Sequence, residues 1–147
     1  MTGCSDMVVK KATFRQRYAL LTVAGIIAAI PAGAQIAVVV HPASRAGTMP
    51  PDHIALYFQG KSNALTPLEQ DKHSAIRRRF YQQIGNMTLS QIESNWARLE
   101  FTGRGAAPQT YPSDAAIKKA LAGDQSAIGY INKVSVDKTV KVILVLP

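Results

Sequence analysis

Runs of apolar residues bounded by turn residues predict the strands of this chain. Residues 36–40 form a β-branched run, Ile-Ala-Val-Val-Val, that ends at His41-Pro42 and is typical of a buried strand. Residues 127–131 and 140–146 have the same apolar character and predict two further strands. The last of these we expect to close the sheet.

Other apolar residues recur at helical spacing between capping residues. In the third predicted helix, Leu89, Ile92, Trp96 and Leu99 form one apolar stripe. The stripe predicts that Trp96 packs in the core and does not stack on a ligand. We expect four helices: from Pro50-Pro51-Asp52 to Gly60, from near Ser74 to Gly85, from a cap at Thr88 or Ser90 through Leu99, and from a cap at Ser113 or Asp114 to Gly123.

The segment Thr66-Pro67-Leu68-Glu69 supports two interpretations. Its pattern is that of a capping box with proline at the first helical position, which favours a helix start. However, residues 69–74 contain no apolar side chain, so a helix there would have no face to bury. We therefore predict a short strand at 65–69, a polar turn, and a helix that begins near Ser74.

The N-terminal 34 residues have the three parts of a secretory signal. A basic region (Lys10, Lys11, Arg15, Arg17) precedes the uncharged run 19–30, and the small-residue site Ala32-Gly33-Ala34 follows it. A retained membrane anchor is the alternative, but a bilayer needs about 20 apolar residues. We expect a signal helix at 1–34 that is cleaved before Gln35, with translation beginning at Met1 or Met7.

Residues 35–147 are expected to form a single α/β domain, with about four strands among four helices and no internal repeat or linker. This part carries 13 basic and 8 acidic residues, a net charge of +5. Such a surplus favours anionic partners without specifying one. The only cysteine, Cys4, precedes the apolar run, so no disulfide or cysteine nucleophile is expected after cleavage.

Motifs of catalysis and metal binding are missing from the sequence. His41, His53 and His73 are scattered, and no pair has the spacing of helical metal ligands. The chain has neither a G-x-S-x-G elbow nor a phosphate-binding P-loop motif. We therefore expect no enzyme activity, no metal and no cofactor.

Ser74 and Arg77 form the most informative candidate site. If a helix opens at Ser74, its first N–H groups have no intrahelical partner, and the helix dipole adds positive potential there. The hydroxyl of Ser74 and the guanidinium of Arg77, one turn along, would complete a site suited to a tetrahedral oxyanion. The alternative is an ordinary cap at Ser74 and a solvated basic face at Arg77 to Arg79.

These residues resemble a known family. The chain is similar to small, single-lobe relatives of the phosphate ABC transporter substrate-binding proteins, within the periplasmic binding protein-like superfamily. The matching segments are 38–42, 54–61, S-x-x-R-x-x-F at 74–80, W-x-x-L-x-F-T-G-R-G at 96–105, Pro108, 113–115 and 127–130. The resemblance implies a lobe with a mixed central sheet flanked by helices, a periplasmic location and a role in phosphate uptake.

The resemblance also carries site residues over to this chain. Full-length phosphate-binding members hold the anion between two lobes, with serine and backbone amides at helix starts. Ser74 and Arg77 correspond to such an element, and Arg104 is added on charge alone. Ala75 stands where the larger proteins have the glycine of a glycine-threonine pair.

Two functions follow as hypotheses. The first is a periplasmic, non-catalytic protein that binds phosphate or a similar oxyanion and works with an ABC permease. The second is an interaction or sensory protein of the cell envelope that keeps the lobe but has lost the solute. A homodimer would supply a second lobe, an uncleaved signal would be the only membrane contact, and nucleic acid is not expected as a partner.

Overall fold

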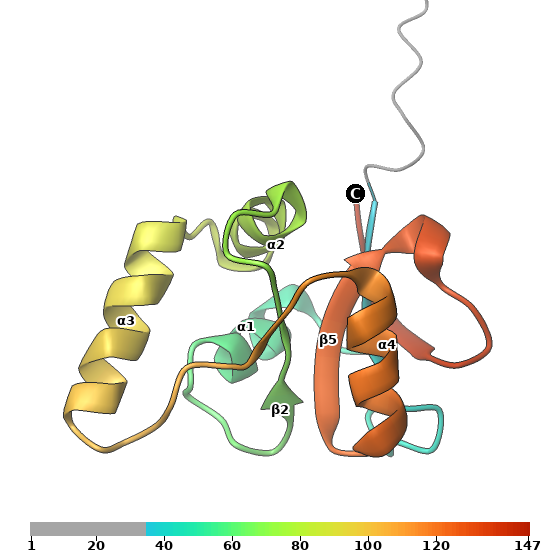
Figure 1. Cartoon of the computed structure of the whole chain (residues 1–147), viewed down its shortest axis with the longest axis horizontal. Helices are drawn as coiled ribbons and strands as arrows, with labels where there is room; N and C mark the ends of the chain where they lie inside the picture. Colours follow the sequence, from blue (N-terminus) through green and yellow to red (C-terminus); the bar gives the residue numbers. More distant parts are fainter. Residues whose placement is uncertain (1–34) are drawn as a thin grey trace, which may run out of the picture.

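The computed structural model describes residues 35–147, so the predicted signal at 1–34 lies outside the described residues. These residues form an α/β domain in which a mixed sheet is flanked by helices, as the sequence predicted (Figure 1). The elements in chain order are β1 (Ile36–Val40), α1 (Pro51–Phe58), β2 (Thr66–Pro67), β3 (Glu69–Gln70), α2 (Ala75–Gly85), α3 (Leu89–Phe101), β4 (Thr110–Tyr111), α4 (Asp114–Gly123), β5 (Ala127–Asn132), the 3-10 turn η2 (Lys133–Ser135) and β6 (Lys141–Leu146).

The main sheet has four strands in the order β2-β5-β1-β6. β1 lies between β5 and β6 and is antiparallel to both, whereas β2 runs parallel to β5. The register places Val38 opposite Tyr130 in β5 and opposite Leu144 in β6. The strand predicted as buried is thus the centre of the sheet.

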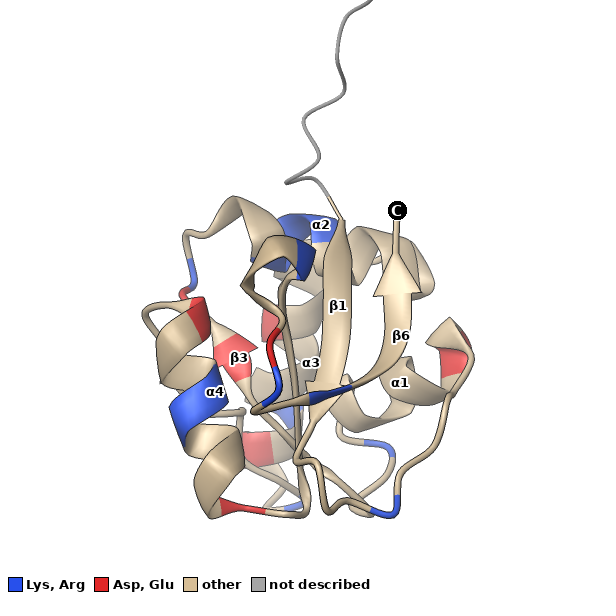
Figure 2. Ribbon diagram, turned by 90° about the vertical axis from the view of Figure 1, so that its right-hand side faces the viewer, with Lys and Arg blue, Asp and Glu red and all other residues tan. Residues whose placement is uncertain are grey.

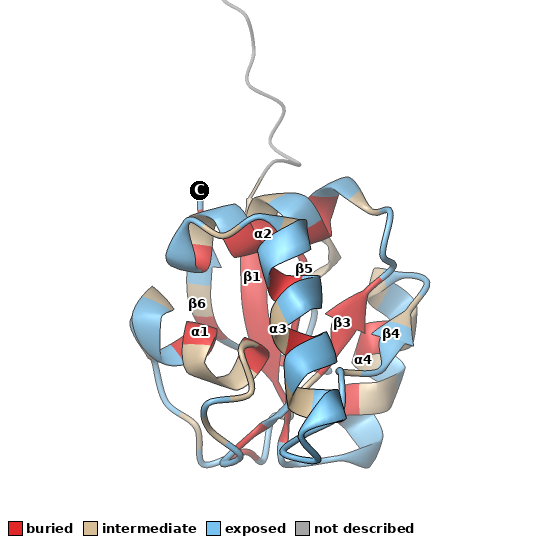
Figure 3. Ribbon diagram, turned by 90° about the vertical axis from the view of Figure 1, so that its left-hand side faces the viewer, coloured by how far each residue is buried: buried red, intermediate tan, exposed pale blue. Residues whose placement is uncertain are grey.

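Both faces of β1 are covered, which explains why its sequence is apolar without alternation. Ile36, Val38 and Val40 pack on the side of α1 and α2, and Ala37 and Val39 pack on the side of α4. All five residues are fully buried, and Figure 3 shows β1 and β5 as buried strands behind more exposed helices.

Serine and threonine caps fix the starts of three helices. The Ser74 side chain accepts a hydrogen bond from the Arg77 amide, and Ser113 accepts one from Ala116. Thr88 forms a full capping box with Gln91, so the cap of α3 is Thr88 and not Ser90. The predicted helices are all present with boundaries close to those expected.

The segment around residue 68 follows the strand interpretation, but with two strands in place of one. β2 pairs with β5 in the main sheet, and β3 pairs with β4 in a separate two-stranded parallel sheet. The chain changes partner at Leu68, whose amide still donates to Ile128 in β5, whereas the next amide, of Glu69, donates to Gln109. The two-residue β4 and η2 were not predicted, because elements this short carry no periodic pattern.

Among residues 35–147, the structure contains no helix that is both long and apolar enough to span a bilayer.

Gly129 is the point at which β5 and α4 come closest. A Cβ atom added there would lie 2.9 Å from Cγ2 of Ile117, which is fully buried in α4. We expect Gly129→Ala to lower the free energy of unfolding by about 1–3 kcal/mol through overpacking. Gly47→Ala is the control, since a Cβ there meets nothing within 4 Å. Equal urea midpoints for the two variants would contradict this account of the α4–sheet contact.

Candidate functional site

The turn before α2 holds Ser74 in place from both sides. Its hydroxyl donates to the Asp71 carbonyl at 2.8 Å and accepts from the Arg77 amide at 3.4 Å. The Asp71 carboxylate accepts from the His73 amide at 2.9 Å, which closes the turn. Ala75 and Ile76 supply first-turn amides that an α-helix leaves without an intrahelical partner. A helix N-terminus with a serine cap is therefore present where the sequence predicted it.

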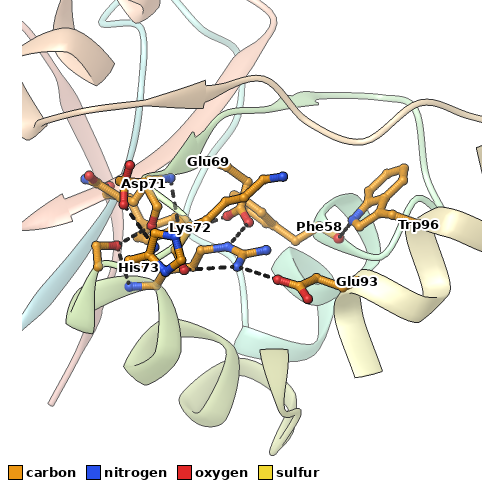
Figure 4. A network of polar contacts seen from close by, with 11 residues as sticks. Phe58, Glu69, Asp71, Lys72, His73, Glu93 and Trp96 are labelled. Atoms are coloured by element: carbon orange, nitrogen blue, oxygen red, sulfur yellow. Dashed lines mark hydrogen bonds and ion pairs between the residues drawn. The ribbon is translucent and has the colours of Figure 1, made fainter. Parts of the chain in front are cut away.

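Arg77 is buried, with 5% of its surface exposed. Its Nε donates to Oε2 of Glu69 in β3 at 2.8 Å, and its Nη1 reaches Oε1 of Glu93 in α3 at 3.4 Å and the Lys72 carbonyl at 3.5 Å (Figure 4). Nη2 makes no hydrogen bond to any described residue. The guanidinium is thus not part of a solvated face: it links β3, α2 and α3 and keeps one terminal nitrogen uncommitted.

Glu69 is the buried partner of this ion pair, with 2% of its surface exposed. It also accepts a hydrogen bond from the Tyr130 hydroxyl at 2.8 Å. Burial raises the pKa of Glu69, and the hydrogen bonds and charge of Arg77 oppose that rise without cancelling it. Burial, together with the Glu69 charge, also raises the pKa of Tyr130 and Tyr81 well above the ordinary value.

Aromatic rings enclose the ion pair on the core side. The Tyr130 ring stacks on Phe80 with centroids 3.8 Å apart, and Phe58 contacts both rings edge-on. The Tyr81 hydroxyl is buried and has no hydrogen-bond partner among the described residues. The carboxylate and guanidinium therefore lie against an apolar wall, which strengthens their mutual attraction relative to a surface pair.

Arg104 lies apart from Ser74 and Arg77. It is exposed in the turn after α3 and lines a pocket of about 400 Å³ together with Tyr57, Trp96 and Asp124. Arg77 lines a different pocket of about 290 Å³, and Ser74 lines neither of the two. The structure thus brings Ser74 and Arg77 together and places Arg104 at a neighbouring pocket, with Trp96 bordering both.

Trp96 belongs to the core, as its place in the apolar stripe predicted. Its indole Nε1 donates to the Phe58 carbonyl at 3.1 Å, and 7% of its surface is exposed. The ring lies directly against Gly60, where a Cβ would approach it to 2.8 Å and where φ is +71°. Gly60 is therefore needed both for its left-handed backbone and for this close approach.

The charged residues are spread over the surface and do not gather in one patch. Figure 2 shows basic residues on α2, on α4 and in turns, with acidic residues at β3 and at helix ends. Within residues 35–147 no group of three or more histidine, cysteine or acidic residues is placed to hold a metal ion.

Two residues that shape this site were not singled out in the sequence. Glu69 was assigned to a cap or a polar turn, and Glu93 to a possible helix cap. Glu69 carries one signal that could have found it, because it is an acidic residue at the end of a predicted strand, where burial requires a partner. The partner itself, eight residues later, is not visible from the sequence.

Solved structures of phosphate transport proteins share this fold. A phosphate ABC transporter substrate-binding protein from Clostridium perfringens, solved with bound phosphate, aligns with a TM-score of 0.60 and 19% identity over 74% of this chain and 43% of that chain. An ABC-type phosphate transport receptor from Vibrio cholerae gives a TM-score of 0.58 and 18% identity, with 74% and 44% coverage. PstS from Borrelia burgdorferi gives 0.54 and 12%, with 74% and 46% coverage.

The comparisons confirm the resemblance at the level of the fold. The described domain has the fold of part of a periplasmic binding protein, consistent with one lobe, and the chain spans less than half the length of the structures it matches. No protein-family profile and no curated protein matches the sequence.

Removing Arg77 should cost more than an exposed ion pair is worth. Arg77→Met leaves the Glu69 carboxylate buried and unpaired, so we expect a loss of about 3–5 kcal/mol in the free energy of unfolding near neutral pH. The loss should shrink at about pH 4. A carboxyl whose folded pKa exceeds its unfolded value stabilises the fold at low pH, and this stabilisation fades as the pH rises through the folded pKa.

Denaturant unfolding at the two pH values measures both effects. Adding Glu69→Gln to Arg77→Met removes the unpaired charge and should recover part of the stability. The ion-pair account is wrong if Arg77→Met costs less than about 1 kcal/mol, the range of an exposed pair.

Proposed function

We propose that this chain is an exported, non-catalytic binding protein that holds phosphate or a similar oxyanion at the start of α2 and serves an ABC transporter. The observation that carries the proposal is the start of α2, where the Ser74 cap and first-turn amides stand beside Arg77. Backbone N–H groups and the positive end of the helix dipole attract an oxyanion to such a position. The phosphate-transport proteins that share the fold support the choice of ligand.

The proposed roles of the three predicted residues differ. Ser74 orients the turn and offers its hydroxyl to the ligand. Arg77 contributes Nη2, since its Nε and Nη1 are committed to Glu69 and Glu93. Arg104 provides a positive charge at the adjoining pocket and does not share the Ser74 site. The site is open on one side, because a single lobe offers no second wall, so we expect affinity well below that of a two-lobed protein.

A second candidate function is the envelope interaction protein that binds no solute. The observation that favours it is the burial of Arg77 against Glu69, which uses most of the guanidinium for structure. In that case the exposed Arg78, and not Arg77, would meet a partner.

Matched serine variants test the anion site. Ser74→Ala and Ser113→Ala each remove a helix cap, at a cost of about 1 kcal/mol in stability, but Ser113 belongs to α4 and lies outside the proposed site. We expect isothermal titration to show phosphate binding by the native chain and by Ser113→Ala, with at least about threefold weaker binding by Ser74→Ala. If no heat and no thermal stabilisation appear at millimolar phosphate or sulfate, the ligand half of the proposal is wrong and the envelope-interaction alternative stands.

Export is tested separately from binding. The signal interpretation of residues 1–34 predicts that the protein recovered from the periplasm begins at Gln35. Intact mass spectrometry of the osmotic-shock fraction reads this N-terminus directly. Replacing Ala34 with a bulky residue should leave the precursor uncleaved. Recovery of the full-length chain from the native protein in the membrane fraction would instead favour the retained anchor.

A further inference from the structure

The pocket of about 290 Å³ beside Arg77 has walls of opposite charge. Lys72 and Arg77, from the segment that joins β3 to α2, line one side, and Glu93 and Glu100, from α3, line the other. Figure 4 shows Glu93 and Trp96 extending from α3 toward the side on which Lys72 and Glu69 lie. The pocket is therefore dipolar, unlike a site built for a simple anion.

The basic wall retains donors for an oxyanion. Arg77 is 95% buried and lines the pocket, yet its Nη2 makes no hydrogen bond to any described residue. A buried guanidinium nitrogen that is left without a protein partner calls for another acceptor at the pocket. Lys72 is exposed and adds a second positive charge.

The acidic wall retains acceptors for a cation. Glu93 and Glu100 are seven residues apart in α3, so they lie on the same helix face, with the small side chain of Ala97 between them. Each carboxylate uses a single oxygen: Oε1 of Glu93 accepts from Arg77, and Oε1 of Glu100 accepts from the Ala107 amide at 2.9 Å. The two Oε2 atoms have no hydrogen bond to the described residues.

The balance of charge disfavours an inorganic dianion in this pocket. The lining contains the carboxylates of Glu69, Glu93 and Glu100 against the cations of Lys72 and Arg77, an excess of one negative charge. A phosphate dianion held by Arg77 would face the carboxylates across the pocket and be repelled by them. A ligand that also carries a positive group would turn this repulsion into attraction.

We infer that the solute bound at this site is a small zwitterion, with an oxyanion on Arg77 and Lys72 and an ammonium on Glu93 and Glu100. The inference rests on the proposed function and specifies its ligand class. The oxyanion is either a phosphoryl group or a carboxylate, because a guanidinium N–H donates to both. The volume accommodates a solute larger than a lone tetrahedral ion.

Two organic phosphates that differ only in an amine test the inference. Titrating the full chain with phosphoethanolamine and with ethyl phosphate measures what the ammonium adds, and inorganic phosphate and glycine complete the set. We expect phosphoethanolamine to bind at least about tenfold more tightly than ethyl phosphate. Tighter binding of glycine than of phosphoethanolamine would identify a carboxylate as the oxyanion and would support the zwitterion equally.

The double variant Glu93→Gln/Glu100→Gln locates the ammonium. Both glutamates are exposed, and the amide retains an oxygen that can accept from Ala107, so the fold should tolerate the change. The preference for phosphoethanolamine should fall to about onefold, with ethyl phosphate binding more tightly than before. Asp52→Asn is the control, because it changes the charge at an exposed residue of α1 outside the pocket and should leave the preference intact.

The outcomes separate this inference from the proposed function. If inorganic phosphate and ethyl phosphate bind as tightly as phosphoethanolamine, or if the double variant keeps the preference, the zwitterion is wrong and the oxyanion site stands. If glycine and all three phosphates leave the chain unbound, both proposals are overturned.

Discussion

The buried ion pair between Glu69 and Arg77 holds the candidate site together. It joins β3 to the first turn of α2, and through Glu93 it reaches α3. Two charges removed from water require close geometry and further hydrogen bonds, and here the Tyr130 hydroxyl supplies one. The pair contributes little net stability relative to an apolar core, but breaking it from either side is costly. It therefore fixes the position of α2 more than it adds to the stability of the fold.

This constraint also determines what the site can do. Because Glu69 neutralises Arg77, the guanidinium attracts an anion less strongly than a free arginine would, and the positive potential comes mainly from the start of α2. The carboxylates of α3 lie across the pocket and restrict the ligands that fit. A lobe of this kind, less than half the length of the two-lobed proteins whose fold it shares, works as an open half-site.

Sequence patterns were sufficient for the elements that repeat or carry caps. β1 was predicted from its apolar run, α3 from the stripe that includes Trp96, and the start of α2 from Ser74. The patterns failed where tertiary contacts decide the structure. Thr66 to Glu69 has the local signature of a helix start, yet pairing with β5 and with β4 makes it two strands. The proximity of Glu69 to Tyr130 is likewise a product of the fold, since these residues are 61 positions apart.

The central claim is that a solute binds at the start of α2. An amide-resolved NMR titration of the full chain with phosphate and phosphoethanolamine tests it most directly, because the claim names the atoms that should respond. The account predicts that saturable shifts centre on the amides of Ala75 and Ile76 and on the Nη2–H resonances of Arg77. Shifts that instead follow the exposed Arg78 and Arg104 without saturation, or no shifts, would contradict it.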